Sequence, residues 1–154
     1  MTVRSLLEDI KTELEDILKA FKVKKENSEE LVSVNLFIQT LPKETVGMDD
    51  ALAPFLLIRA EEMNQSSPGA YTEVTVTLTG CLWDDDETMQ GFYDLFNLFE
   101  RIGIELRKRR YSDSKQYSLN SFRTVFDEED TYPFFYAAAQ LEWSGVNIDV
   151  NEEW

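Results

Sequence analysis

The chain has 154 residues, of which 43% are hydrophobic and 12% aromatic, and 30 acids against 15 bases give a net charge of −15. This length suits one domain with a proper core, and this composition excludes a chain that is disordered throughout. The charge disfavours general nucleic-acid binding, which needs a basic footprint, although excess acid also serves solubility.

Neither a membrane span nor an export signal is predicted. No run of 18 apolar residues occurs, and the residues from Met1 to Arg4 do not begin a signal-peptide core. We therefore expect a soluble protein that has no membrane partner. Cys81 is the single cysteine, so no internal disulfide bond can form, which fits a reducing compartment.

The first predicted element is an amphipathic helix over residues 2–22. Its N-terminal cap is either Thr2 or Ser5, and Ser5 is followed three residues later by Glu8, as in a capping box. The polar face is mixed and rich in acid, so the helix is expected to pack on the core or on another subunit. The apolar stripe consists of Val3, Leu6, Leu7, Ile10, Leu14, Ile17, Leu18 and Phe21.

Two strands are predicted next, over residues 31–41 and 54–60. In the first strand, Phe37 falls on the polar face, where it is either an ordinary exposed aromatic residue or an interface contact. The second is a nearly continuous apolar run, so we expect it in the centre of the sheet. The segments 43–53 and 62–70 are predicted loops, of which the first is long for a compact domain. We expect both to be the most mobile part of the free protein and to order when they bind partners on assembly.

The strongest strand signal lies at residues 72–80, where Val74, Val76 and Leu78 alternate with threonines. One apolar face and one hydroxyl face indicate a strand that covers a core on one side only. A long helix is predicted at 86–109, and this one-sided pair indicates an antiparallel sheet with the helix packed on it. The predicted core stripe of the helix is Met89, Phe92, Phe96, Phe99, Ile102 and Leu106.

Charged runs mark both ends of this helix. The acids from Asp84 to Glu87 lie where a helix N-terminus takes a cap and negative charge. The basic run from Arg107 to Arg110 lies at the C-terminal end, where the helix dipole favours cations. It is either a helix end in water or a docking patch for an acidic neighbour. A second basic run extends from Lys22 to Lys25.

Two further strands are predicted at 117–126 and 133–143, with an acidic turn from Asp127 to Asp130 between them. An acidic tail follows at 147–154. We therefore predict an α+β fold as a single domain over 1–154. It consists of a mostly antiparallel sheet with two amphipathic helices packed on it, in the order α-β-β-β-α-β-β.

The sequence predicts no catalytic residue, no cofactor-binding residue and no metal ligand. It contains no histidine, no CxxC, no glycine-rich phosphate loop and no GxSxG. Paired carboxylates can hydrolyse glycosides or hold magnesium, but we interpret 84–87 as a helix cap and 127–130 as a solvated turn. Flanking acids are expected to raise the pKa of Cys81, interpreted as a buried or half-buried hydrophobe. We therefore expect a protein that is not an enzyme; a carboxylate hydrolase is the weakest alternative.

The order of elements resembles that of the small tail-terminator and head–tail joining (neck) proteins of long-tailed bacteriophages and their prophage relatives. The resemblance begins with the N-terminal amphipathic helix and covers most of the chain as a pattern. It continues through the strand at 54–59, the loop before the strand at 71–78, the long helix at 87–108, and the strand pair that closes with residues 132–135 and Trp143.

This resemblance implies a non-catalytic structural protein that caps the tail tube or joins tail to head by forming a homo-oligomeric ring, usually a hexamer. The implied partners are further copies of the chain together with tail-tube and connector proteins, without direct nucleic-acid binding. The implied location is the virion, after assembly in the bacterial host cytoplasm. Cys81 and Trp154 have no counterpart in it. The alternative is an acidic monomeric binding or inhibitor protein in the bacterial cytoplasm that covers a basic partner by charge complementarity.

Overall fold

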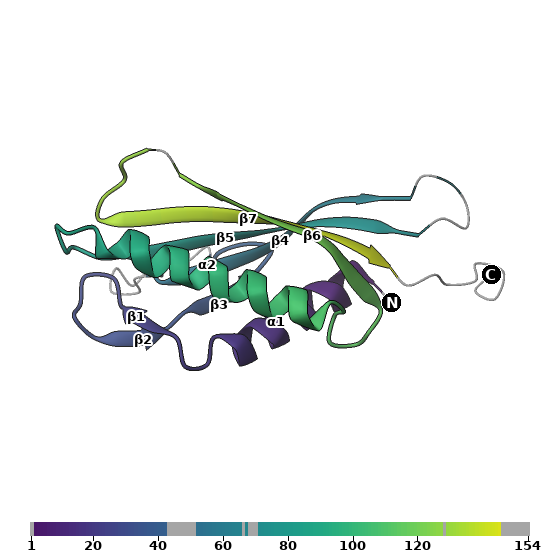
Figure 1. Ribbon diagram of the computed structural model, residues 1–154, viewed down its shortest axis with the longest axis horizontal. Helices are drawn as coiled ribbons and strands as arrows, with labels where there is room; N and C mark the ends of the chain where they lie inside the picture. Colours follow the sequence, from purple (N-terminus) through teal and green to yellow (C-terminus); the bar gives the residue numbers. More distant parts are fainter. Residues whose placement is uncertain (1, 43–51, 66, 68–70, 128, 146–154) are drawn as a thin grey trace.

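The computed structural model describes residues 2–42, 52–65, 67, 71–127 and 129–145. It has the predicted α+β class, with two amphipathic helices and a mostly antiparallel sheet (Figure 1). The elements in chain order are α1 (Val3–Ile17), β1 (Lys22–Lys24), β2 (Leu31–Ser33), β3 (Asn35–Ile38), β4 (Phe55–Asn64), β5 (Glu73–Trp83), α2 (Gln90–Arg109), β6 (Tyr117–Phe126) and β7 (Phe134–Gly145).

The main sheet has five strands in the order β3-β4-β5-β7-β6, and β1 and β2 form a separate two-stranded ribbon. All neighbours in the main sheet are antiparallel except β3 and β4, which are parallel. The longest pairing joins β5 and β7, where Val76 lies opposite Leu141 and Leu78 lies opposite Ala139. These apolar residues alternate along both strands, so one face of the sheet is continuous and buried.

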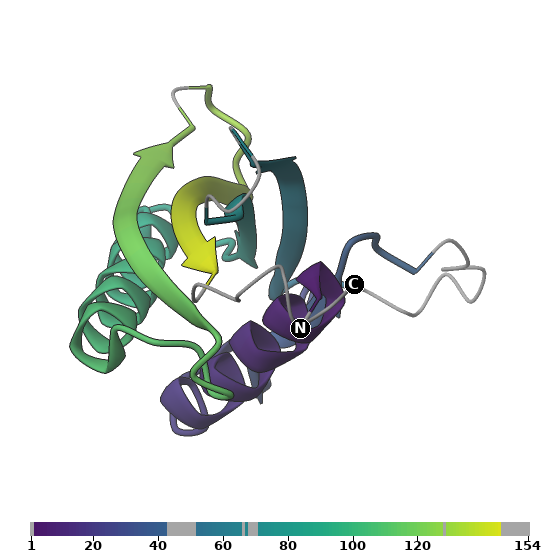
Figure 2. The same cartoon turned by 90° about the vertical axis from the view of Figure 1, so that its right-hand side faces the viewer.

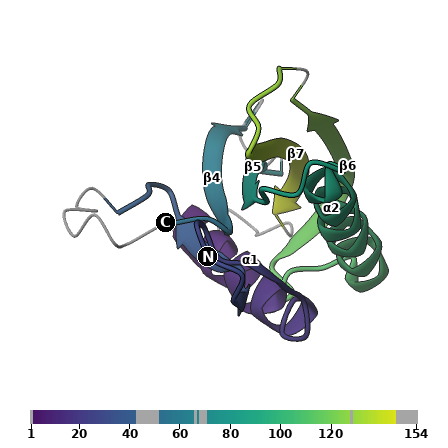
Figure 3. The same ribbon diagram turned by 90° about the vertical axis from the view of Figure 1, so that its left-hand side faces the viewer.

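Both helices pack on that buried face. α1 contacts β3 and β4, whereas α2 contacts β5, β6 and β7, and the two helices also touch each other. Figure 2 and Figure 3 show α2 beside β6 at one side of the sheet and α1 at the other. The side chains of both helices and of the strands form one hydrophobic cluster, which is the core of the protein.

The helix α1 begins as predicted but ends five residues early. Thr2 is the N-cap: its hydroxyl accepts a bond from the Ser5 N–H, and the Ser5 hydroxyl accepts one from the Thr2 N–H, both at 3.0 Å. The helix stops at Ile17 rather than at residue 22, because Lys22–Lys24 instead pairs with β2 and buries Val23. The predicted range of 2–22 therefore merged a helix with a short strand.

The predicted strand at 31–41 is two strands that serve different sheets. β2 pairs with β1, and β3 pairs with β4, so the chain changes partners at Val34. β3 ends at Ile38, because Gln39 adopts a left-handed backbone angle (φ 69°) that an extended strand cannot continue. The prediction missed this division because the alternation of apolar residues runs through both pieces.

The acids before α2 do not cap it, which corrects the predicted start at residue 86. The helix begins at Gln90 after Met89, which has a left-handed backbone (φ 63°) and makes no side-chain capping bond. Asp86 instead accepts bonds from the N–H and the hydroxyl of Thr88, at 2.8 and 2.7 Å, which closes a local turn. The predicted basic residues do lie in the last turn of α2.

The buried stripe of α2 is rotated from the predicted one. Leu95 and Leu98 are fully buried, whereas Phe96, expected in the core, is 41% exposed. Two glycines explain the rotation, because they let the helix approach the sheet closely. A Cβ atom at Gly91 would lie 2.2 Å from the ring of Phe135, so only glycine fits there.

The sheet also buries a small cluster on its far face, although β5 was expected to cover a core on one side only. Cys81 and Trp83, at the end of β5, pack there with Ala53 and Phe55. Phe37 belongs to this second cluster, with its ring centroid 6.3 Å from that of Phe55. It is therefore partly buried against the far-face cluster rather than a separate exposed aromatic residue.

The β4 strand is longer than predicted and continues to Asn64, so the first part of the predicted loop at 62–70 is strand. The β4–β5 hairpin extends past the helices, and its outer residues are exposed (Figure 1). The expected binding loops fall largely outside the described residues, namely at 43–51, 66 and 68–70. The predicted acidic tail at 147–154 also lies outside them.

Candidate functional site

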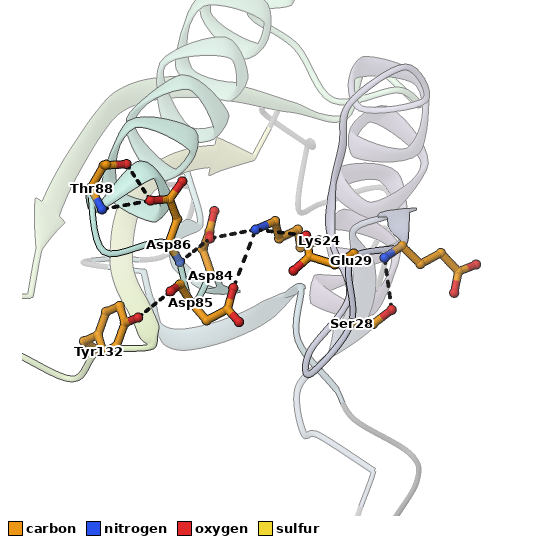
Figure 4. A network of polar contacts seen from close by, with 9 residues as sticks. Lys24, Ser28, Glu29, Asp84, Asp85, Asp86, Thr88 and Tyr132 are labelled. Atoms are coloured by element: carbon orange, nitrogen blue, oxygen red, sulfur yellow. Dashed lines mark hydrogen bonds and ion pairs between the residues drawn. The ribbon is translucent and has the colours of Figure 1, made fainter.

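The first acidic run surrounds a lysine from the β1–β2 ribbon (Figure 4). Lys24 Nζ lies 3.2 Å from Asp84 Oδ1, 3.6 Å from Asp85 Oδ1 and 3.4 Å from Glu29 Oε2. Asp84 is only 3% exposed, and its hydrogen bond raises the pKa of Lys24 above the usual range. The ion pair therefore joins the β1–β2 ribbon to the turn between β5 and α2.

The remaining groups of this run bond to nearby backbone. Asp84 Oδ1 accepts a bond from the Asp86 N–H at 2.9 Å, and the Tyr132 hydroxyl donates to the Asp85 carbonyl oxygen. The two bonds from Thr88 lower the pKa of Asp86. Within the described residues, no three acidic or cysteine side chains come together as a metal site. The predicted helix cap is thus replaced by an ion pair and local turns.

The second acidic run is a turn, as predicted. Asp127 accepts a bond from the Glu129 N–H at 3.0 Å, and Asp130 accepts one from the Tyr132 N–H at 3.1 Å. These carboxylates bond to backbone two residues ahead, which is how aspartate stabilises a turn. The turn connects β6 to β7 and approaches the first run through Tyr132.

A buried carboxylate that the prediction missed lies near the other end of α2. Glu13 is 4% exposed, and its Oε2 has no hydrogen-bond partner among the described residues. Burial raises its pKa to about 7, opposed by the positive charge of Arg109. Glu13 falls three residues after Ile10 and four before Ile17, so the helical spacing itself could have revealed it.

Basic side chains at the C-terminal end of α2 form contacts with other residues of the chain. Arg109 Nη2 lies 2.6 Å from Asp16 Oδ2, which joins α2 to α1 and lowers the pKa of Asp16. Arg107 Nε donates to the Gly103 carbonyl oxygen at 2.9 Å, and Lys108 lies 3.7 Å from Glu105. The basic run is thus a helix end whose Arg109 also holds the two helices together.

Cys81 is buried, as expected. Its thiol is unreactive, but the main cause is burial rather than the charge of the flanking acids. Burial is the main cause that raises its pKa to about 12, and a weaker contribution comes from Glu26 rather than from the flanking acids. The thiolate, which is the nucleophilic form, is therefore scarce at neutral pH. Cys81 acts as a packing residue beside Tyr136 in the second cluster.

An open apolar surface lies between α2 and β6, and sequence reasoning missed it. Phe96 and Tyr93 of α2 are both exposed, and the ring of Phe96 lies 4.8 Å from that of Phe126. Phe96 and Phe126, together with Phe122 and Arg107, border a shallow groove along the edge of the sheet. The prediction placed Phe96 in the core, so it did not recognise the groove. The arrangement suits binding of another chain rather than bond-making chemistry.

Comparison with known proteins gives no family. No protein-family model matches the chain, and no curated protein matches it significantly. Across the described ranges, no helix is both long enough and apolar enough to cross a membrane.

Proposed function

We propose that this protein is a non-catalytic structural protein of a bacteriophage or prophage, which forms a homo-oligomeric ring that caps the tail tube or joins the tail to the head. It would assemble in the host cytoplasm and end in the virion. The partners would be further copies of the chain and tail-tube or connector proteins. Neither a cofactor nor direct nucleic-acid binding belongs to this role.

The observation that supports the proposal is the arrangement of the elements. An N-terminal helix and a long central helix lie on one face of a mostly antiparallel sheet, and the sheet closes with a strand pair. This is the order on which the resemblance to tail-terminator and neck proteins rests. Because fold supports function only by analogy, the surface must agree with the role.

The surface favours assembly. The β4–β5 hairpin extends beyond the helices and carries Met63, which is 64% exposed. A second apolar surface follows α2 through Tyr93 and Phe96. The exposed hairpin and the apolar surface on α2 are two different patches, which suits a ring, because each subunit of a ring contacts its neighbours through two different patches.

One feature favours the alternative of an acidic monomer that covers a basic partner. The net charge of −15 is large for this length, and it would steer a basic protein toward the chain. Crowding of like charges also opposes self-association.

Electron microscopy of the purified chain, with light scattering for its mass, separates the two functions. We expect rings of uniform subunit number, either for the chain alone or after addition of a phage tail-tube protein. A chain that remains monomeric under both conditions, and that binds a basic protein with a strong salt dependence, would instead establish the alternative.

A further inference from the structure

The strand β6 forms one edge of the main sheet, and part of that edge is covered. The Leu119 N–H donates to the Arg110 carbonyl oxygen at 2.7 Å, and the Ser112 N–H donates to the Tyr117 carbonyl oxygen at 2.8 Å. The segment that follows α2 therefore protects the first residues of β6 on the side away from β7. A register shift between Leu119 and Ser121 ends this protected part.

The rest of the edge, from residue 120 to 126, is open. The Asp127 N–H donates to the Tyr136 carbonyl oxygen and so points toward the β7 side. Because backbone direction alternates along a strand, the N–H and C=O groups of Phe122, Thr124 and Phe126 point away from β7. Nothing in the described part of the chain pairs with this stretch other than β7. An open edge of this kind is a template for an additional strand.

The groove beside α2 lies along the same open stretch. The side chains of Phe122, Thr124 and Phe126 border it from the sheet, and Phe96, Glu100 and Arg107 border it from the helix. An added strand would place every second side chain in this groove. Its other side chains would lie beside Arg123 and Val125, and Val125 is 54% exposed. The site thus fits a strand with one apolar face and one polar face, with acid accepted near the two arginines.

The segment 146–154 of this chain has that pattern. Its nine residues read Val-Asn-Ile-Asp-Val-Asn-Glu-Glu-Trp, and they lie outside the described residues. Val146, Ile148, Val150, Glu152 and Trp154 share one parity, so an extended backbone would put four apolar side chains and the Glu152 carboxylate on one face. Asp149 falls on the opposite face, toward Arg123. Nine extended residues span about 30 Å, enough to follow the seven open residues of β6, which span about 23 Å.

We propose that segment 146–154 of one copy adds as an outer strand to the β6 edge of a second copy. A second copy is favoured because Gly145, where the segment begins, lies opposite Tyr117 at the covered end of β6. To reach its own edge, the segment would have to pass around residues 110–112 and reverse direction. The inference rests on the self-association in the proposed function, although not on a phage role.

Cross-linking of two differently tagged copies tests the contact directly. One full-length copy carries Val125→Cys and the other carries Asp149→Cys, while Cys81 is buried and does not compete. Mild oxidation of the mixture should give a disulfide-linked heterodimer on a non-reducing gel. The matched control replaces Val125→Cys by Met63→Cys, which is at least as exposed but lies on the β4–β5 hairpin, and it should give at least ten-fold less heterodimer.

The backbone pairing has its own test. In the Val125→Cys copy, Thr124→Pro removes an N–H that points away from β7, so the native sheet keeps its bonds, whereas Thr124→Ala retains that N–H. The proline should lower the heterodimer yield at least five-fold and the alanine should not. If circular dichroism shows that the proline variant is unfolded, Phe96→Glu replaces it, with the same expected loss. An excess of a synthetic peptide of residues 146–154 should also compete with the cross-link.

Equal yields from Val125→Cys and Met63→Cys would overturn the inference. So would a closed monomer formed at high dilution when both cysteines are in one chain, because the segment would then occupy its own edge. Rings seen by electron microscopy without the cross-link would contradict this contact and leave the proposed function standing. A cross-link without rings at any concentration would support this contact and contradict the proposed function.

Discussion

A buried carboxylate lies near each end of α2: Asp84 before its start, and Glu13 of α1 beside its C-terminal end. The two differ in how their charge is compensated. Asp84, before the helix, is paired with Lys24 at 3.2 Å and accepts a bond from the Asp86 N–H. Glu13, near the end of the helix, has an unpaired Oε2, and its neighbour Arg109 is held instead by Asp16. Both are almost inaccessible to water.

This difference teaches that burial alone does not decide what a carboxylate does to stability. A buried charge with a partner and a backbone donor fixes the position of its neighbours. A buried charge without them costs free energy, and the group takes up a proton more readily instead. One end of α2 is therefore held by charge, whereas the other depends on pH.

The largest effect on stability is expected from the apolar face of α2, which lies between these two carboxylates. Phe99→Ala should lower the free energy of unfolding by about 3–5 kcal/mol, because the ring is fully buried in the core. Phe96→Ala is the control one turn away, and it should cost clearly less, about 1 kcal/mol, because Phe96 is 41% exposed. Urea titration of both variants measures the difference. Similar costs for the two would show that the helix is rotated toward Phe96 after all.

Loss of the paired carboxylate should have the next largest effect. Asp84→Ala should destabilise the protein by about 2–3 kcal/mol, because it leaves the Asp86 N–H unpaired and removes the buried partner of Lys24. Asp85→Ala is the matched control, since Asp85 also faces Lys24 but is half exposed, and it should cost at most about 1 kcal/mol. If Asp85→Ala cost as much as Asp84→Ala, burial of the pair would not be the cause.

The unpaired carboxylate should reveal itself through pH. The pKa of Glu13 is about 7 when folded against 4.5 in the unfolded chain, so the folded protein retains a proton that the unfolded chain releases. Stability should therefore fall as the pH rises from about 4.5 to 7. Glu13→Gln should be more stable than the parent at pH 8, by about 1–2 kcal/mol because the buried amide also lacks partners, and should lose that advantage by pH 4.5.

Thermal unfolding of the parent and Glu13→Gln at both pH values measures this effect. Glu15→Gln serves as a control, because Glu15 lies two residues away on the exposed side of α1. An advantage for Glu13→Gln that is equal at both pH values would mean that the pKa of Glu13 does not change on folding, and it would contradict the predicted pH dependence.

The smallest expected effect concerns the ion pair that occupies Arg109. Asp16→Asn should free the guanidinium and remove one nearby negative charge, so the pKa of Glu13 should fall by a fraction of a unit. Titration of the Glu13 carboxyl by NMR would detect this change. The unfolding temperature should change little, since the pair is partly exposed to solvent. An unchanged or raised Glu13 pKa would show that Arg109 does not act on Glu13.

Local sequence patterns were enough to predict the elements and the fold class. Alternation in β5 and β7, and a period of three to four residues in the helices, follow from backbone geometry, so they are visible without the fold. The range predicted for β6, 117–126, is the range observed. Boundaries were weaker where a pattern runs through a break, as at Val34, or where a side chain competes for backbone bonds, as at Asp86.

The candidate surfaces required the tertiary structure. Lys24 and Asp84 are 60 residues apart, and only the docking of the β1–β2 ribbon brings them together. The rotation of α2, which exposes Phe96, depends on the Phe135 ring filling the space beside Gly91. The open edge of β6 depends on strand order, which no local pattern encodes. The sequence by itself determined what each segment could form, because those preferences are local. The tertiary structure decided which groups meet and which remain exposed, because packing brings together faces that are distant along the chain.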